Sequence, residues 1–307
     1  MVLSLEKNTK VLAIDLGSNT IRFVAYDCQK DTFLWAFEKI VKTADNLHQS
    51  KIVSKEAMRR VVCAILEAKT LYDFTNHKVV AYTTQAIRVA LNSSDVLQYI
   101  SEQTGVKFTI IDGELEAKLT LKAIEYRVKK LNISNDEFAL IDIGGGSTEI
   151  TFKYKDRVIS KSFPIGIVTI AQRYTTLDEI SKNLDKEFLS LKEFIKSIYE
   201  KNPKVNSLIA TAGTPTTLAS MKHKMSYKSY DSSKINGTLI YLDELQLYLN
   251  RLLNMSQEQR VEAVGVGRDD LIIAGILIYQ KIFKLLDLNS SIIIDDGLRE
   301  GIALSEC

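Results

Sequence analysis

"LIDIGGGSTEI", residues 140–150, places one carboxylate, Asp142, at the end of an apolar run and follows it with three glycines and two hydroxyls. Consecutive glycines cost conformational entropy on folding, so this pattern indicates a turn in which side chains have to be absent from the backbone. A similar stretch, "VLAIDLGSNTIRF", occupies residues 11–23 and has Asp15 in the place of Asp142. The repeat predicts two halves that each begin with the same strand–turn–strand plan.

The composition is that of an ordinary globular protein. Apolar residues make up 46% of the 307-residue chain and charged residues 25%. This length suits two domains better than one. The 40 basic and 38 acidic side chains nearly cancel, so we expect no duplex nucleic acid as a partner and only a local site for an anion.

Cysteines and apolar segments bear on the compartment. Three cysteines, Cys28, Cys63 and Cys307, are widely spaced and odd in number, which predicts free thiols in a reducing compartment. The charged start "MVLSLEKNTK" lacks the apolar core of a signal peptide. The longest apolar run, "LIIAGILIY", is about half of a membrane span. We therefore expect a cytoplasmic protein that has no membrane partner.

Strands and helices alternate in both halves after an opening hairpin. Expected strands cover 11–16, 21–27, 33–41, 78–84, 107–112, 137–143, 148–154, 158–163, 207–213 and 291–295, and expected helices cover 54–73, 85–103, 114–130, 269–286 and 297–306. This order predicts an α/β fold of two duplicated domains, with mixed sheets flanked by helices. We place the domains at 1–124 and 125–307, facing each other across a cleft, with a hinge at a helix end near 124–136. As an alternative, the last helix, 296–307, packs back onto the first domain.

The paired turns "DLGSNT" and "DIGGGST" predict phosphate binding, because backbone N–H groups of such turns point at phosphate oxygens when no Cβ stands in the way. Five polar side chains add donors: Ser18, Asn19, Thr20, Ser147 and Thr148. The strand-end acids Asp15 and Asp142 suit a hydrated Mg²⁺. Ordinary tight hairpin turns are the alternative, but two copies in register favour phosphate binding.

A third turn, "IATAGTPTTLASM", ends a strand and opens a helix at Pro215. Gly213 and Thr214 thus lie at a helix N-terminus, where anions are stabilised. The alternative is an ordinary connection between a strand and a helix. Three arginines offer planar forks that match phosphate oxygens: Arg22, Arg88 and Arg268. A lysine cluster, together with Arg268, would guide a long anion toward the cleft: Lys222, Lys224 and Lys228. For each of these basic residues, a solvated surface position is the alternative.

The segment "IIDGELEAKL" places Glu114 and Glu116 in the first turn of a helix. A carboxylate there would take a proton from an attacking water, or it would only complement the helix dipole. Zinc is disfavoured because the three histidines have no ligand spacing: His48, His77 and His223. No P-loop, dinucleotide-binding or nucleophile-elbow motif occurs in the sequence.

Seven motifs occur in the order expected for one known family: "VLAIDLGSNTIRFVAYD", "AYTTQAIRVALNS", "IIDGELEAKLTLKAI", "ALIDIGGGSTEI", "SFPIGIVTI", "ATAGTPTTLASM" and "DDGLREGIAL". With them the chain resembles the exopolyphosphatase / guanosine pentaphosphate phosphohydrolase (Ppx/GppA) family of the actin-like ATPase superfamily, over about residues 11–304. The resemblance implies the short form of the family, with two actin-like (ribonuclease H-like) domains and an active site in the cleft between them.

The resemblance also implies a reaction: hydrolysis of the terminal phosphoanhydride of polyphosphate or of guanosine pentaphosphate, the latter a reaction of the stringent response. A divalent metal, Mg²⁺ or alternatively Mn²⁺, would assist an in-line attack by water. Glu116 falls on the catalytic Glu of the family, and Glu114 is the runner-up. Asp15 and Asp142 fall on the acids that position metal and water.

Other family positions concern the phosphate. Arg88 falls on the phosphate-contacting Arg and Glu149 on an acid after the second phosphate loop. The glycines of the two loops are Gly17, Gly144, Gly145 and Gly146. Leu115 and Lys118 replace the usual Glu and Arg of the helix motif, which bears on substrate preference.

Two alternatives to a hydrolase stay open. One is a small-molecule kinase of the same superfamily, since fold alone does not exclude it. The other is a non-catalytic sensor that binds guanosine tetra- or pentaphosphate. The sequence also leaves the oligomeric state open, with a homodimer as one alternative.

Overall fold

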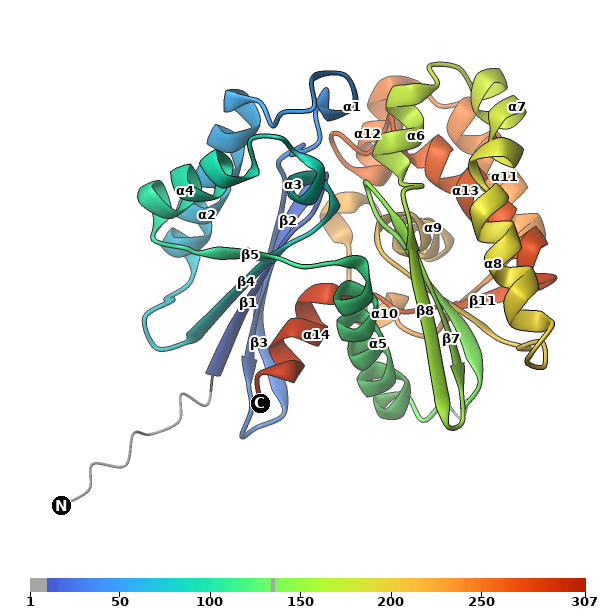
Figure 1. Ribbon diagram of the computed structural model, residues 1–307, viewed down its shortest axis with the longest axis horizontal. Helices are drawn as coiled ribbons and strands as arrows, with labels where there is room; N and C mark the ends of the chain where they lie inside the picture. Colours follow the sequence, from blue (N-terminus) through green and yellow to red (C-terminus); the bar gives the residue numbers. More distant parts are fainter. Residues whose placement is uncertain (1–9, 134–135) are drawn as a thin grey trace. The chain divides into compact units, whose positions relative to one another are not determined.

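The computed structural model describes residues 10–133 and 136–307 (Figure 1); most of the charged N-terminal stretch therefore lies outside the described residues. The chain divides into two compact units. Unit 1 comprises the described residues up to Ala123 together with Leu298–Cys307, and unit 2 comprises Ile124–Gly297. The division falls inside one continuous helix, α5 (Gly113–Lys130), between Ala123 and Ile124.

Unit 1 contains a five-stranded mixed sheet in the order β3-β2-β1-β4-β5. β1 pairs antiparallel with β2 and parallel with β4, so the opening hairpin and the following strand–helix alternation share one sheet. Its elements besides α5 are β1 (Lys10–Leu16), β2 (Thr20–Asp27), β3 (Thr32–Ile40), α1 (Leu47–Ser50), α2 (Lys55–Leu71), β4 (Lys78–Thr83), α3 (Gln85–Val89), α4 (Ser93–Thr104), β5 (Phe108–Ile110) and α14 (Leu298–Ser305).

The last helix of the chain completes the core of unit 1. Val11 and Ala13 of β1 point to the same face, because side chains alternate along a strand, and there they pack with Leu298 and Ile302 of α14. In Figure 1 this helix, red, lies against strands coloured blue. The opposite face is aromatic: Trp35 stacks on Tyr72, with ring centroids 4.6 Å apart.

The expected helix over 85–103 is in fact two helices, α3 and α4, with a break at residues 90–92. The break is caused by tertiary contacts. The side chain of Asn92 accepts from the N–H of Val53 at 2.9 Å and donates to its carbonyl at 3.0 Å, while the N–H of Leu91 donates to Lys51. These bonds hold the segment in a conformation that a continuous helix would not allow.

Unit 2 contains a six-stranded mixed sheet in the order β10-β11-β9-β6-β7-β8. Its elements are β6 (Phe138–Ile143), β7 (Thr148–Tyr154), β8 (Arg157–Phe163), α6 (Ile167–Arg173), α7 (Leu177–Glu187), α8 (Leu189–Tyr199), β9 (Leu208–Thr211), α9 (Gly213–Lys222), the 3₁₀ turn η1 (Tyr227–Ser229), α10 (Ser232–Ile235), β10 (Thr238–Tyr241), α11 (Leu242–Leu253), α12 (Gln257–Val264), α13 (Ile272–Leu286) and β11 (Ser290–Ile293).

The core of unit 2 lies on one face of this sheet. Ile141 and Ile143 of β6 and Phe152 of β7 belong to a single apolar cluster with Tyr279 and Phe283 of α13. Helix α13 is buried on nearly all sides, which explains its continuous apolar run in the sequence. None of the described helices is both long enough and apolar enough to cross a membrane.

The free-thiol prediction is wrong for two of the three cysteines. Cys28, directly after β2, and Cys307, after α14, form a disulfide with a Cα–Cα distance of 5.6 Å, whereas Cys63 is free and exposed. The two bonded cysteines are 279 positions apart, and only the return of α14 to the sheet of unit 1 brings them together. The inference of a reducing compartment loses its basis with this bond.

Candidate active site

The turn between β1 and β2 is closed by one backbone hydrogen bond, in which the N–H of Gly17 donates to the carbonyl of Thr20 at 3.0 Å. Two polar side chains in this turn are buried: Ser18 is 5% exposed and Asn19 is 9% exposed. Within residues 10–133 and 136–307, neither side chain makes a hydrogen bond. The turn thus keeps polar groups without a protein partner.

The carbonyls of this turn are tied to the segment that follows β3. The N–H groups of Val41 and Lys42 both donate to the carbonyl of Asn19 at 2.9 Å, and the N–H of Ala44 donates to the carbonyl of Ser18 at 2.8 Å. A trans peptide group points its N–H opposite to its carbonyl. The N–H groups of Asn19 and Thr20, which share peptide groups with these two carbonyls, therefore point away from residues 41–44.

Asp15 and Arg22 lie on the face of the sheet that carries Val11 and Ala13, since strand residues two apart share a face. They stand opposite each other in the β1–β2 register. Asp15 is 7% exposed. Arg22 forms an ion pair with Glu38 of β3, Nε–Oε2 3.6 Å, so one of the predicted phosphate ligands already has an acidic neighbour.

Arg88 and Glu116 come together in unit 1. The guanidinium of Arg88, on α3, donates to the carbonyl of Ile111 and to Gln85 Oε1, the latter at 2.6 Å. Its Nη1 lies 3.8 Å from Glu116 Oε2. Glu116 is only 8% exposed, whereas Glu114 on the same helix turn is exposed. The structure thus places one of the two candidate bases beside the arginine and the other in solvent.

The second turn, between β6 and β7, repeats the closure of the first: the N–H of Gly144 donates to the carbonyl of Ser147 at 2.9 Å. A Cβ on Gly144 would lie 3.0 Å from that carbonyl oxygen, which favours glycine there. Ser147 is 3% exposed, and its hydroxyl has no hydrogen-bond partner in the described part of the chain. The hydroxyl of Thr148, by contrast, donates to the carbonyl of Ile165.

The carbonyls of the three glycines, residues 144–146, are all tied to the first turn of α6. The N–H groups of Ile167, Val168 and Thr169 donate to the carbonyls of the first two glycines, at 3.0, 2.8 and 3.3 Å. The hydroxyl of Thr169 donates to the carbonyl of the third at 3.1 Å. The N–H groups of residues 145–147 find no acceptor among the residues that the structure describes.

Asp142 and Glu149 stand opposite each other in the β6–β7 register, and Ser162 of β8 is the next residue in the row. The row lies on the face opposite to Ile141 and Ile143, hence away from the apolar cluster. Glu149 is 3% exposed and accepts from the hydroxyl of Ser162 at 2.6 Å. Two acids thus lie side by side at the second turn, one of them fixed by a serine.

The third turn, after β9, has a strained backbone. Ala212, just before α9, has φ 72° and ψ −173°, a region that is essentially reserved for glycine. Thr214 is 1% exposed, and its hydroxyl faces Gly275 of α13. The predicted helix N-terminus is present at Gly213, but the side chain of Thr214 contributes to helix packing.

The predicted basic residues have different surroundings. The guanidinium of Arg268 lies over the ring of Tyr227, 5.4 Å from its centroid. Lys222 forms an ion pair with Glu244, Nζ–Oε1 2.8 Å, and also donates to the carbonyl of Leu239. It is thus held inside its own unit. The side chain of Lys228 lies outside the described residues.

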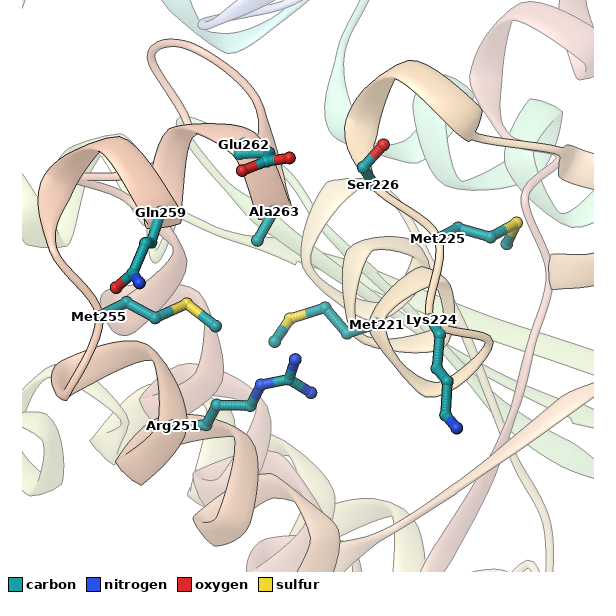
Figure 2. A pocket seen from close by; sticks show the side chains of 9 residues that line it. All are labelled: Met221, Lys224, Met225, Ser226, Arg251, Met255, Gln259, Glu262 and Ala263. Carbon is teal, nitrogen blue, oxygen red and sulfur yellow. The ribbon is translucent and has the colours of Figure 1, made fainter.

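Lys224 lines a hollow of about 510 Å³ between α9, α11 and α12 (Figure 2). Its walls carry three methionines and the guanidinium of Arg251, which points toward them; the residues that line it are Met221, Lys224, Met225, Ser226, Arg251, Met255, Gln259, Glu262 and Ala263. Met221 is on the last turn of α9, roughly 12 Å along the helix from Gly213. The hollow is therefore separate from the third turn.

Several residues beside the second and third turns were not identified from the sequence. Arg127 and Asp296 form a two-point ion pair, Nε–Oδ2 2.6 Å and Nη2–Oδ1 2.9 Å, and the carbonyl of Asp296 accepts from the hydroxyl of Thr211. Gly166 and Thr169 contact the second turn. The motifs "DDGLREGIAL" and "SFPIGIVTI" contain Asp296, Gly166 and Thr169, but periodicity and composition assign them no role.

Comparison with known proteins gives one family. The model of the Ppx/GppA phosphatase family matches residues 29–307. A curated relative, the bifunctional 3-dehydroquinate synthase/phosphatase of Fusobacterium nucleatum, is 26% identical over 285 residues, which cover 88% of this chain and 42% of that protein. The chain thus spans about two fifths of the length of this relative.

Solved structures show the same fold. An Aquifex aeolicus PPX-GPPA enzyme is 26% identical, with a TM-score of 0.75 over 97% of this chain and 99% of the other. An exopolyphosphatase from Cytophaga hutchinsonii is 22% identical, with a TM-score of 0.84 over 96% and 97% of the two chains. The predicted fold, two actin-like α/β domains with mixed sheets flanked by helices, is confirmed.

Proposed function

Because the chain belongs to the Ppx/GppA phosphatase family, we propose that it hydrolyses the terminal phosphoanhydride of inorganic polyphosphate, of guanosine pentaphosphate or of both, by in-line attack of water. The observation that carries the proposal is the common construction of the two turns. Both are closed by the N–H of a glycine, and both have carbonyls tied back to neighbouring backbone. Both therefore leave N–H groups and hydroxyls available, which is the arrangement that binds phosphate oxygens.

Glu116 is the proposed general base. Phosphoryl transfer needs positioning and charge stabilisation more than covalent catalysis, so a single carboxylate suffices to orient the water and accept its proton. The burial of Glu116 and its position 3.8 Å from Arg88 support this choice over the exposed Glu114. Arg88, held by Gln85 and Ile111, would contact the phosphoryl oxygens.

Asp15 and Asp142 are the carboxylates that we propose for Mg²⁺, with Mn²⁺ as the alternative. Each stands at a strand end beside its own turn, and hydrated Mg²⁺ needs only one or two protein carboxylates. Among the described residues, no group of three or more His, Cys, Asp or Glu side chains is placed so that it could hold a metal ion, so the proposal rests on one or two carboxylates with water as the remaining ligands. A bound cation would offset negative charge on the phosphate chain.

The test is orthophosphate release from long-chain polyphosphate and from guanosine pentaphosphate, measured side by side with and without Mg²⁺. The proposal expects release from at least one substrate and its loss when a chelator removes the metal. Phosphate transfer from ATP to a small acceptor, without release from either substrate, would indicate a kinase. Tight binding of guanosine pentaphosphate without any release would indicate a sensor.

A further inference from the structure

The first turn of α6 lies directly against the glycine turn of unit 2. We propose that Thr169 and Gly166 are positioning residues: they hold the glycine carbonyls so that the N–H groups of residues 145–147 face the phosphate. The inference rests on the proposed phosphate hydrolysis and adds residues that the resemblance does not assign.

The direction of the N–H groups in the glycine turn follows from the planarity of the peptide group. The carbonyls of residues 144, 145 and 146 belong to the same peptide groups as the N–H groups of residues 145, 146 and 147. Each carbonyl accepts from residues 167–169 of α6. Since a trans peptide group directs its N–H opposite to its carbonyl, three successive N–H groups are turned away from the helix.

The second step concerns the donors that α6 uses. The first N–H groups of a helix have no partner within the helix and need a cap. Gly166, the residue before α6, supplies no side-chain cap, and the glycine carbonyls take that role instead. A peptide group that accepts a hydrogen bond at its carbonyl becomes a stronger donor at its N–H. The helix end therefore strengthens the turn as a phosphate ligand as well as orienting it.

The third step is the close approach of the two backbones at Gly166. A Cβ built on Gly166 would overlap the carbonyl group of Gly145 and the carbonyl carbon of Gly146. These are backbone atoms that cannot rotate away as a flexible side chain can. Glycine at position 166 is thus required for α6 to reach the turn at all.

The hydroxyl of Thr169 can be removed by substitution without changing the backbone contacts between α6 and the turn. Its hydroxyl is the only donor to the carbonyl of Gly146 within the described residues. Without it, the peptide group between Gly146 and Ser147 would lose its anchor, and glycine adds little resistance to rotation. The N–H of Ser147 would then no longer be fixed toward the phosphate.

The test compares Thr169→Val, which keeps the shape and loses the hydroxyl, with Thr169→Ser, which keeps the hydroxyl. One lost hydrogen bond should raise KM for the substrate about 3–10-fold, with kcat little changed because the turn holds ground state and transition state alike. Thr169→Ser should restore KM to within about twofold of the wild type. Binding of imidodiphosphate, measured by calorimetry, should weaken by the same factor in Thr169→Val.

An unchanged KM and unchanged imidodiphosphate binding in Thr169→Val would overturn the inference. So would a Ser variant as impaired as the Val variant, because a role in packing alone would follow the missing methyl. If the wild type releases no phosphate but binds imidodiphosphate, the hydrolase proposal fails and the binding data still decide on Thr169. If the wild type neither releases phosphate nor binds imidodiphosphate, both proposals fail.

Discussion

Glu114 and Glu116 are two positions apart, yet the fold gives them different surroundings. The sequence places both acids in the first turn of a helix, and periodicity alone does not indicate which of them is the general base. In the structure Glu116 is buried beside Arg88 and Glu114 is exposed. Residues two apart on a helix point roughly 200° away from each other, so the two acids face different sides of α5, and Arg88 of α3 lies on the side of Glu116. Pairings of this kind depend on tertiary structure and are not encoded in local spacing.

Glu116→Gln should lower kcat for phosphate release by about 10²–10⁴, because the amide cannot accept the proton of the attacking water. Substrate binding should persist, since the isosteric amide keeps the shape of the side chain. Steady-state kinetics of phosphate release give kcat, and calorimetry with imidodiphosphate gives binding.

Glu114→Gln is the matched control on the same helix turn and should keep kcat within about twofold of the wild type. A Glu116→Gln protein with normal turnover would remove Glu116 from the mechanism. A large loss of kcat in Glu114→Gln instead would transfer the role of the base to that residue.

Ala212 gives a second prediction at a single residue. Its φ of 72° with ψ of −173° costs about 1–3 kcal/mol for a residue with a Cβ, and Ala212→Gly would relieve that strain. Glycine also increases the conformational entropy of the unfolded chain, which lowers the free energy of unfolding by about 0.5–1 kcal/mol. We therefore expect a net stabilisation of up to about 2.5 kcal/mol, measured by urea unfolding.

Ala219→Gly, in the interior of α9, is the control for this substitution and should destabilise the protein by about 1 kcal/mol or more. A loss of stability in Ala212→Gly similar to that of the control would show that the backbone at position 212 is not strained.

At the scale of elements, strands were more predictable than helix boundaries. The two hairpins β1–β2 and β6–β7 form where the apolar runs and glycine turns indicate, because alternation and turn chemistry are local. The break between α3 and α4 was missed, since it depends on the bonds of Asn92 to Val53. The strand β10 was also missed: only its third residue is fully buried, so its apolar pattern is weak.

Helix α7 provides a prediction about pH. Its capping box joins Thr176 and Glu179, and hydrogen bonds from the backbone N–H and the hydroxyl of Thr175, together with the N–H of Thr176, lower the pKa of Glu179 below its ordinary value of 4.5. A lowered pKa means that the cap stabilises the folded state fully above pH 4.5 and loses this contribution as the pH falls through the pKa of the folded state.

The stability difference between the wild type and Glu179→Gln should therefore be largest near about pH 7 and shrink toward about pH 3. Urea unfolding followed by circular dichroism at both pH values measures it. Glu193→Gln, at an exposed position of α8, is the control for the loss of one acidic side chain. A difference between wild type and Glu179→Gln that does not vary with pH would contradict the role of the carboxylate in the cap.

At the scale of the whole molecule, the disulfide between Cys28 and Cys307 is the feature that could least be predicted from the sequence. An odd number of distant cysteines indicates free thiols, and only the packing of α14 on the sheet of unit 1 makes the bond possible. Ion pairing of Lys78 with Glu306 and a hydrogen bond from Lys122 to the carbonyl of Leu304 hold the same segment.

Cys307→Ser should lower the free energy of unfolding of unit 1 by about 2–5 kcal/mol, because a bond that closes so long a loop constrains the unfolded chain. The chain has one tryptophan, Trp35, stacked on Tyr72 in unit 1, so its fluorescence reports the unfolding of that unit. Reducing agent should affect the wild type as the substitution does. Cys63→Ser should have no effect on the fluorescence transition, and an equal shift in both variants would contradict a special role for the disulfide.

The membership of α14 in unit 1 also has a consequence for biosynthesis. The core of that unit needs Leu298 and Ile302, yet the ribosome makes them only after the whole of Ile124–Gly297. At about 5–20 residues per second, roughly 9–35 s separate the synthesis of Ala123 from that of Leu298. During that interval the core of unit 1 has Leu119 of α5 but lacks Leu298 and Ile302, so part of the apolar face of its sheet is exposed, and we expect chaperones that bind apolar surface to act on the chain then.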